Sequence, residues 1–514
     1  MSTGSQQTLA LFNSIYWKTP PDLLSSFEGE VGFSFGPSPG WLLSNLEQHL
    51  ATGRQALEEE RYREAALSFA AVVTLLPSEW SIWQMAAQAW NLAGDRVRER
   101  EAWRGAYAHW AGEDVRNLFG IGAGLLQCGA PFEATTCLER VAAALPRDSS
   151  ALGALAAAYR SSGQLTRAWR TIQRALTISP RSPTLCLTAA QIRHAQGNLA
   201  DAHRWLDKAD RLRPNHGPTQ LQRGLTTLLA GPSAPGWAGF EERGLPSCHS
   251  GGAPWRGESL TGASIVVLAE QGVGDLFHFL RFIPVLADRG PASLIVEAHG
   301  STHALLERNG LTVVNPGNAP KTDWCVPVLS LPHVLGIDGD YVTNRFPYVV
   351  TGDLPSPSRR RPSGRPRIGV TWKGNPGFLA TALRDFNFAL LPELSSLMDA
   401  EWISLQLDEP VPEGFQNAGV RSPDWLETAR LLESLDCVIS VDTAIAHLAG
   451  AMGLSPIVLL PYSPDWRWGL ASATTAWYPG MQLIRQAAPN EWRSVLPELQ
   501  RTIYQRFAPG SPRS

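Results

Sequence analysis

The sequence predicts an array of paired helices in the first half of the chain and two α/β lobes in the second half. Two observations support this fold class. Gly129, Gly163 and Gly197 lie 34 residues apart, and alanines and prolines around them recur at the same spacing, which is typical of a helical repeat. The second half instead contains continuous apolar segments that end in glycine turns, which is typical of buried parallel strands.

The composition predicts a folded chain of several domains. Its 514 residues are 44% hydrophobic and 18% charged, which excludes a disordered protein and suggests about three domains of roughly 150 residues. The net charge of −3 argues against a generally basic nucleic-acid-binding protein. No apolar run reaches the roughly 18 to 20 residues that a membrane span needs, and the N-terminus lacks a signal-peptide pattern. We therefore expect no nucleic-acid partner and no membrane span.

The six cysteines carry little functional information. They form no CxxC pair, and no Cys/His cluster has the spacing of zinc ligands. We interpret them as free, buried thiols in a reducing compartment. This interpretation predicts a cytoplasmic protein without a metal site.

Each repeat unit is predicted to contain a helix, a tight turn, a second helix and a proline stop. In the unit that ends at Pro180, Gly163 can adopt the left-handed conformation that closes the first helix. Ala168 and Ala175 let the paired helices approach closely, and Pro180 ends the second helix. We assign the repeat superhelix to residues 46–230, after an N-terminal segment (1–45) of unknown role.

These positions resemble the tetratricopeptide repeat, whose small and aromatic positions match Ala154, Tyr159, Gly163, Ala168, Ala175 and Pro180. We count five repeats over about 46–216 and a closing helix over 218–230. The first two repeats are degenerate, because Glu60 stands where the turn glycine belongs and Glu99 stands where alanine is expected. Stacked repeats form a curved surface that usually holds a peptide or partner. A structural scaffold or dimerisation arm is the alternative.

The second half predicts two consecutive lobes, over 231–355 and 356–514. In the first lobe, the apolar segment SIVVLAE (264–270) is followed by QGVGD, a helical segment and ASLIVEA, which indicates a βαβ unit. An arginine-rich segment (356–366) is expected to be an exposed hinge. In the second lobe we expect strands at RIGVT, WISLQL, CVISV and SPIVLLPY. Ligands bind at the carboxyl ends of such strands, so a cleft between the lobes is the predicted site.

The first candidate motif contains Gly272, Gly274 and Asp275, between a predicted strand and a helix. The glycines permit tight backbone geometry and close approach of a ligand. The motif is too short for a dinucleotide fingerprint, and it lacks the GK[ST] of a phosphate-binding P-loop. Asp275 is either an acidic residue favoured by the helix dipole or a general base at the edge of the cleft.

The second candidate motif begins at Asp442 and includes Thr443, Ala444 and His447. It follows the apolar strand CVISV and starts a helix, so the free amides of the first turn form an anion site. Thr443 and His447 are four residues apart and share one face. His447 either donates to a phosphate or is a satisfied core residue.

Three further candidates lie at strand ends of the second lobe. Lys373 and Asn375 belong to the segment WKGNP that follows RIGVT, and Gln406 ends WISLQ. Lys373 either supplies a positive charge to a diphosphate or is a solvated loop residue. Gln406 either contacts a base or ribose or has a structural role.

The ordered set of motifs resembles bacterial glycosyltransferases that carry tetratricopeptide repeats. The segments are EQGVGDLFHFLRFIPVL, TWKGNP, SLQ, DTAIAHLAGAMG and LLPYSPDWRW, behind GWAGFEER. The second half is similar to the heptosyltransferase family (glycosyltransferase family 9), and more distantly to O-linked N-acetylglucosamine transferases. The resemblance implies two Rossmann-like lobes in the GT-B arrangement.

The resemblance also implies roles for the residues that match its motifs. Asp275 is the implied catalytic base, and Lys373 contacts the diphosphate. Thr443, Ala444 and His447 hold phosphates, with Asp442 beside them. Beyond what the resemblance implies, we assign Gly272, Gly274, Asn375 and Gln406 to the nucleotide-sugar site. Transfer proceeds with inversion and needs neither a metal nor another cofactor. The chain departs from the family where Arg384 is followed by Asp385, since relatives often have an Arg-Ser pair there.

We therefore expect an inverting transfer of a sugar from a nucleoside diphosphate sugar to an acceptor hydroxyl, on a protein or peptide recruited by the repeats. Two alternatives remain open. The first is a repeat scaffold whose α/β half binds nucleotide without catalysis. The second is a sugar transferase that modifies lipopolysaccharide core or another glycan.

Overall fold

A computed structural model describes residues 39–112, 114–339, 346–352, 364–375, 377, 381–407, 409–419 and 424–508. The chain divides into two compact units, one formed by the chain up to Pro146 with residues 376–379, and one formed by the remainder from Arg147. Most of the predicted N-terminal segment and of the predicted hinge lies outside the described residues.

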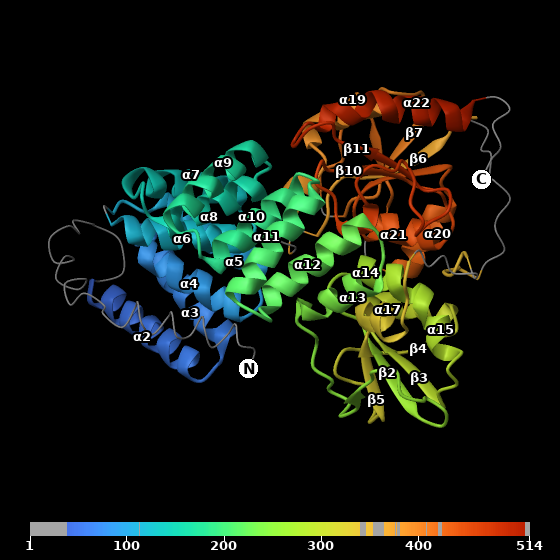
Figure 1. The fold of residues 1–514 in the computed structure, drawn as a ribbon, viewed down its shortest axis with the longest axis horizontal. Helices are drawn as coiled ribbons and strands as arrows, with labels where there is room; N and C mark the ends of the chain where they lie inside the picture. The colour runs from blue at the N-terminus through green and yellow to red at the C-terminus, as the bar shows by residue number, and fades with distance from the viewer. Residues whose placement is uncertain are drawn as a thin grey trace. The chain divides into compact units, whose positions relative to one another are not determined.

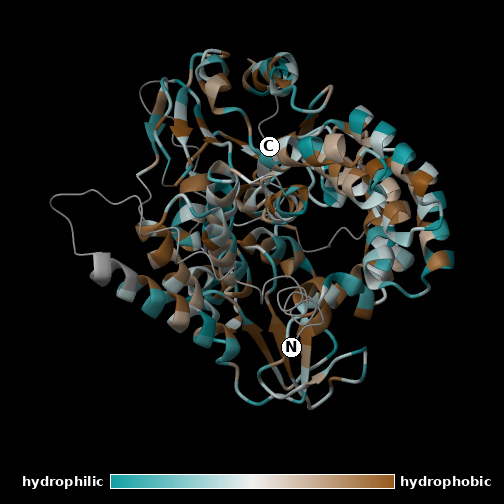
Figure 2. Ribbon diagram, turned by 90° about the vertical axis from the view of Figure 1, so that its left-hand side faces the viewer, coloured by the Kyte–Doolittle hydropathy of each residue, from teal (hydrophilic) through white to brown (hydrophobic). Residues whose placement is uncertain are grey.

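The first unit consists of helices that pack in sequential pairs (Figure 1). They are α2 (Pro39–Glu58), α3 (Tyr62–Leu75), α4 (Trp80–Leu92), α5 (Arg96–Ala108), α6 (Val115–Gln127) and α7 (Pro131–Ala144). Small residues permit the close approach of these helices. A Cβ atom at Gly105 would collide with the Trp83 indole, and one at Gly124 would collide with the Trp103 indole. Hydrophilic and hydrophobic residues alternate along the helices (Figure 2).

The second unit begins with five more helices of the same kind, which are α8 (Ser149–Ser161), α9 (Leu165–Ile178), α10 (Pro183–Ala195), α11 (Leu199–Leu212) and α12 (Gly217–Ala230). The predicted helical repeat is confirmed. The turn glycines have φ values of +81° at Gly129, +80° at Gly163 and +74° at Gly197, a conformation in which side chains are strained. Glu60 adopts the same conformation, with φ of +58°.

Helix α12 leads into the first lobe through a contact between two backbones. It packs against α13 (Ala234–Phe240), where Gly224 and Gly239 face each other. A Cβ atom at Gly224 would lie 2.6 Å from the Gly239 carbonyl carbon and from the Phe240 amide nitrogen. Backbone atoms cannot move aside as a flexible side chain can, so this junction requires glycine.

The first lobe contains a parallel sheet with strand order β1-β5-β2-β3-β4. The strands are β1 (Ala253–Pro254), β2 (Ser264–Leu268), β3 (Ser293–Glu297), β4 (Thr312–Val314) and β5 (Trp324–Pro327). The helices are α14 (Val273–Phe279), α15 (Ile283–Ala287), α16 (His303–Arg308) and α17 (Leu331–Val334). Ile265 and Val267 belong to the main core together with Leu276 of α14. Val266 and Leu268 point to the other face and join a smaller cluster.

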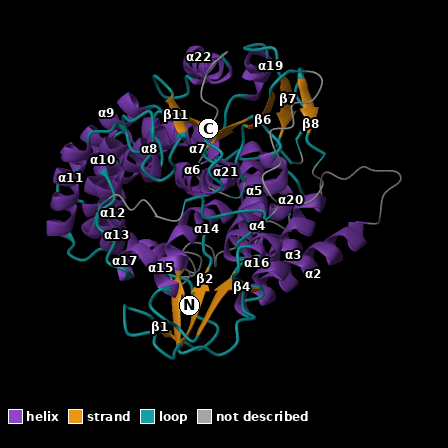
Figure 3. Ribbon diagram, turned by 90° about the vertical axis from the view of Figure 1, so that its right-hand side faces the viewer, coloured by secondary structure: helices purple, strands orange, loops and turns teal. Residues whose placement is uncertain are grey.

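The second lobe contains a parallel sheet with strand order β11-β10-β9-β6-β7-β8. The strands are β6 (Arg367–Thr371), β7 (Glu401–Ser404), β8 (Phe415–Asn417), β9 (Cys437–Val441), β10 (Ile457–Leu460) and β11 (Gln482–Arg485). Helices α19 (Leu391–Ser395) and α22 (Leu496–Phe507) cover one face (Figure 1), and α20 (Trp425–Glu433) and α21 (Ala444–Ala451) cover the other. The short α18 (Thr381–Arg384) precedes α19. Burial on both faces explains the continuous apolar strands, and the predicted α/β region with two parallel sheets is confirmed (Figure 3).

The last repeat helices contact the second lobe within the same unit. The Asn490 side chain donates to the Ser162 carbonyl at 3.0 Å, and Leu470 lies against Gly197. The Trp237 indole of α13 meets the Trp466 indole edge to face, with ring centroids 5.3 Å apart. The repeats are therefore packed onto the lobe through their turn glycines.

All six cysteines are free thiols, and only Cys248 is partly exposed. Burial raises the pKa values of Cys128 and Cys137 to about 12. Among the described residues, the structure contains no helix that combines the length and apolar character of a bilayer-spanning segment.

We predict that Gly224→Ala lowers the free energy of unfolding by about 1–3 kcal/mol, because the added methyl group must displace backbone atoms. Chemical denaturation followed by tryptophan fluorescence measures the change. Gly120→Ala is the matched control. Its methyl group would meet only the Gln84 side chain, at 3.6 Å, so the variant should gain up to about 1 kcal/mol from helix propensity. Equal effects of both substitutions would contradict the prediction.

A second prediction concerns His194 of α10, whose Nδ1 lies 3.1 Å from the Thr226 hydroxyl. Burial, assisted by the Arg160 charge, lowers the pKa of His194 to about 4. Between about pH 6.5 and 4, His194 is therefore protonated in the unfolded state but neutral in the folded state. Acidification through this range should reduce the free energy of unfolding by up to about 3 kcal/mol more in the parent than in His194→Asn. Chemical denaturation at each pH measures this difference. A difference in the free energy of unfolding between the two proteins that stays constant from pH 6.5 to 4 would refute this assignment.

Candidate functional site

Asp275 lies in the first turn of α14, directly after the carboxyl end of β2. Its Oδ2 accepts a hydrogen bond from the Gly272 amide at 3.0 Å, so the carboxylate caps its own helix. The preceding turn is tight, since Gln271 has φ of +59°. The Asp275 side chain is 17% exposed, which leaves it accessible from the solvent side.

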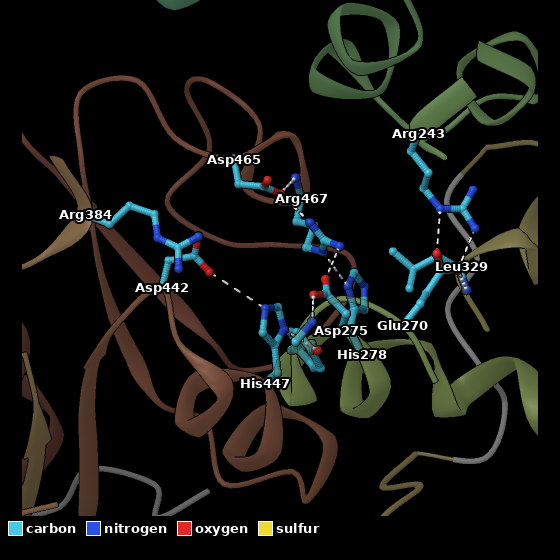
Figure 4. Close-up of polar contacts among 12 residues, drawn as sticks. Arg243, Glu270, Asp275, His278, Leu329, Arg384, Asp442, His447, Asp465 and Arg467 are labelled. Carbon is cyan, nitrogen blue, oxygen red and sulfur yellow. Dashed lines mark hydrogen bonds and ion pairs between the residues drawn. The ribbon is translucent and has the colours of Figure 1, made fainter. Parts of the chain in front are cut away.

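Arg467 from the other lobe holds this carboxylate. It lies in the 3-10 turn Trp466–Trp468 and donates from Nη2 to Asp275 Oδ1 (Figure 4). It also donates from Nη1 to Asp465 at 2.8 Å and from Nε to His278 Nδ1 at 3.1 Å. Burial of Arg467 disfavours its charge, but Asp465 and Asp275 outweigh this cost and raise its pKa.

His278 is a fully buried imidazole that accepts from Arg467. Because Nδ1 accepts, the hydrogen-bond pattern assigns the ring proton to Nε2. Burial and the neighbouring Arg281 charge lower the pKa of His278 well below its usual value, so the ring is neutral. It stacks on His447 with centroids 5.2 Å apart and an interplanar angle of 10°.

The start of α21 presents backbone donors without a side-chain cap. Thr443 is the N-cap residue, and its hydroxyl lies 2.9 Å from the Ser440 hydroxyl instead of capping the helix. The first backbone bond of the helix runs from the His447 amide to the Thr443 carbonyl. The amides of Ala444 and Ile445 therefore lack an intrahelical acceptor, and both residues are partly exposed. Such a helix start favours an anion.

Asp442 and His447 are buried beside this helix start. The Arg384 guanidinium lies 3.5 Å from Asp442 Oδ2, and His447 Nε2 lies 3.7 Å from Asp442 Oδ1. Burial disfavours the charge of Asp442, but Arg384 and His447 outweigh this effect and hold its pKa well below the usual range. His447 Nδ1 is 2.8 Å from the Tyr478 hydroxyl. Both ring nitrogens of His447 thus face protein groups, and its role toward phosphate stays a prediction.

Gly274 is where α14 and α21 meet. A Cβ atom at Gly274 would lie 3.1 Å from the Ala444 Cα and 3.1 Å from the His447 Cδ2. The close approach that this glycine permits is therefore to the start of α21. It brings the Asp275 turn and the Thr443–His447 turn into one site.

Gln406 has a structural position at the end of β7. Its Oε1 accepts from the Thr371 hydroxyl at 3.0 Å and from the Lys373 amide at 3.2 Å. Asp385 accepts from the Gly374 amide at 3.0 Å, and burial raises the pKa of this carboxyl. These two side chains fix the loop that follows β6, and the contacts of Gln406 with base or ribose stay a prediction.

Lys373 is half-exposed in that loop, and its Nζ pairs with Glu409 at 2.5 Å. A diphosphate would have to compete with this carboxylate or bind beside it. Asn375 is exposed in the same loop. The structure thus places Lys373 and Asn375 at the carboxyl end of β6, next to the strand that leads to Asp442.

Sequence reasoning missed three residues of this site, which are His278, Arg384 and Arg467. Arg467 had a signal, because a lone arginine between Trp466 and Trp468 after an apolar strand has to find acidic partners when it is buried. Arg384 was noted only as the residue before the departure at Asp385, and the structure pairs it with Asp442. Among the described residues, no group of three or more His, Cys, Asp or Glu side chains is arranged to hold a metal ion.

No family model matches this chain. Protein FlbA of Caulobacter vibrioides is 23% identical over 322 residues, which cover 54% of this chain and 53% of FlbA. The chain therefore spans about half the length of this relative.

Among solved structures, the chain is similar to YrrB, described as a TPR protein with an unusual peptide-binding site. The identity is 15%, the match covers 35% of this chain and 95% of YrrB, and the TM-score is 0.28. It is also similar to MamA of Desulfovibrio magneticus RS-1, with 18% identity, coverage of 33% and 94%, and a TM-score of 0.28.

We predict that Arg467→Met lowers the free energy of unfolding by about 1–3 kcal/mol, since it leaves two partly buried carboxylates without their cation. Asp275→Asn combined with Arg467→Met should cost less than the sum of the two single changes, with a coupling of about 0.5–3 kcal/mol. Urea denaturation of the parent, the two single variants and the double variant measures this coupling. Arg204→Met removes a pair whose arginine is 76% exposed, and should cost less than about 1 kcal/mol. Similar losses of unfolding free energy in Arg467→Met and Arg204→Met would contradict the prediction that the Arg467 ion pairs stabilise the fold more than a surface pair does.

Proposed function

We propose that this chain is a metal-independent inverting glycosyltransferase, which moves a sugar from a nucleoside diphosphate sugar to an acceptor hydroxyl. The observation that carries the proposal is the junction at Gly274, where the turn that carries Asp275 in one lobe packs against the uncapped start of α21 in the other. A base and an anion site come together there from two parallel sheets, at the carboxyl ends of their strands.

The start of α21 is the proposed seat of the donor diphosphate. Backbone amides of Ala444 and Ile445 supply hydrogen-bond donors there. Lys373 and Arg384 lie in the same lobe, where they pair with Glu409 and Asp442. Negative charge grows on the leaving diphosphate in the transition state, so fixed donors stabilise the transition state more than the ground state. The same groups take the place that a divalent cation fills in other transferases.

Asp275 is the proposed general base toward the acceptor hydroxyl. Its two oxygens accept from Arg467 and from the Gly272 amide, yet a carboxylate has about four lone-pair positions and can accept further bonds. Arg467 fixes the direction of the carboxylate. Arg467 is therefore a positioning residue, and Asp275 takes the proton as the acceptor oxygen attacks the sugar.

The acceptor is proposed to be a protein or peptide, because stacked helical repeats form a curved surface suited to an extended chain. In the second unit these repeats are packed directly onto the lobe that carries the proposed donor site. An acceptor held along the repeats of the second unit would thus be tethered to the same compact unit as Asp275.

The decisive experiment incubates the full chain with a panel of nucleoside diphosphate sugars and a cell lysate, and follows nucleotide release and sugar transfer. We predict that Asp275→Asn lowers turnover by about 10²–10⁴-fold, the usual contribution of a general base, while thermal shifts with nucleoside diphosphates stay unchanged. Asp399→Asn, at a residue that is 83% exposed, should keep full activity.

Full activity of Asp275→Asn would remove this residue from the reaction. Nucleotide binding without turnover of any donor would support the scaffold alternative instead. Mass spectrometry of the labelled products separates modified protein from modified glycan.

A further inference from the structure

The first lobe contains a second hollow, on the other side of its sheet from α14. This pocket, named here the β3 pocket, has a volume of about 420 Å³ and is lined by Pro246, Ser247, His249, Leu268, Ala269, Glu297, Pro316 and Gly317. Volumes of this size are typical of small-molecule sites. It lies at the carboxyl ends of β2 and β3, where parallel sheets bind their ligands.

The alternation of side chains along the strands separates this pocket from Asp275. Ile265 and Val267 of β2 pack into the core that includes α14, whereas Leu268 points to the opposite face. In β3, Glu297 is two residues beyond Ile295, which belongs to the cluster of Leu268. The β3 pocket and the Asp275 site therefore use different faces of one sheet.

Glu297 is the charged group of the pocket. Its side chain belongs to a residue that is 7% exposed, and its Oε1 accepts from the Gly317 amide at 2.8 Å. Its Oε2 is buried and has no hydrogen-bond partner among the described residues. No Lys or Arg is among the residues that line the pocket. A buried carboxylate oxygen without a partner is costly, and a ligand with N–H donors and a positive charge would relieve that cost.

Apart from Glu297, the pocket presents both apolar and polar surface. Leu268 belongs to a cluster with Val266, Ile295 and Cys325, and it forms an aliphatic wall beside Glu297. Ser247 and His249 are exposed at the rim. A ligand that fits has a cationic donor at one end and a hydrocarbon part next to it.

We infer that the β3 pocket binds a primary ammonium group carried on a short aliphatic chain, with the ammonium paired to the Glu297 carboxylate. A free aliphatic amine and the lysine side chain of a protein both present this chemistry. The site is independent of the proposed sugar transfer, because it occupies the other face of the sheet.

The test measures binding to the full-length protein by isothermal titration calorimetry or ligand-observed NMR. The probes are n-pentylammonium and its neutral isostere 1-pentanol, with Nα-acetyl-lysine methylamide as the protein-lysine probe. A charge-assisted hydrogen bond predicts that pentylammonium binds at least about tenfold more tightly than pentanol. Tighter binding of the lysine probe than of pentylammonium identifies a protein ligand, and the reverse order identifies a free amine.

Variants locate the binding at Glu297. Glu297→Gln keeps the shape of the side chain and should weaken pentylammonium by at least about tenfold. Glu307→Gln, at an exposed position of α16, should leave binding unchanged. Ser247→Lys keeps Glu297 and places an ammonium at the rim, so it should block the probe even if Glu297→Gln does not fold. Equal affinity for pentylammonium and pentanol, or unchanged binding in Ser247→Lys, overturns the inference.

Discussion

A buried guanidinium organises the centre of the α/β half. Arg467 has lost most of its water, and it can be ionised there only because carboxylates and an imidazole surround it. One of these carboxylates, Asp275, belongs to the other lobe. The requirement to neutralise one cation therefore fixes the position of the residue that we propose as the base. It also fixes the tautomer of His278, on which His447 stacks.

A second ion pair, between Arg384 and Asp442, lies on the other side of the site. Asp442 ends β9 in a buried position, and Arg384 reaches it from α18. Without that arginine, a carboxylate next to the start of α21 would occupy the positive end of the helix dipole and oppose an anionic ligand. The arginine compensates this charge, which leaves the backbone amides available. Arg467 and Arg384 thus solve the same physical problem on the two sides of one junction.

The first sheet has a different environment on each face, because successive side chains along its strands point to opposite faces. One face packs against α14 and presents Asp275 from the following turn, whereas the other face carries a small apolar cluster and Glu297. Both environments lie at the carboxyl edge of the strands. In the first, charges are compensated within the protein; in the second, one carboxylate oxygen lacks a compensating group among the described residues. This contrast is why we interpret the first as a reaction site and the second as a binding site for a cation.

The sequence by itself determined what depends on near neighbours along the chain. The turn conformations at Gly129, Gly163 and Gly197 follow from a spacing and from the freedom of glycine. The buried strands follow from continuous apolar segments, and Asp275, Lys373, Gln406 and Asp442 could be placed at strand ends because a strand and its following turn are contiguous.

Only the tertiary structure decided which of these residues meet and which distant residues pair with them. Arg467 is 192 positions from Asp275, so no local pattern links the two. The close contact of Gly274 with Ala444, the pairing of Arg384 with Asp442 and the structural contacts of Gln406 also depend on packing between separate elements. The physical reason is that burial and charge compensation are properties of a three-dimensional environment, whereas turns and strands are properties of a local segment.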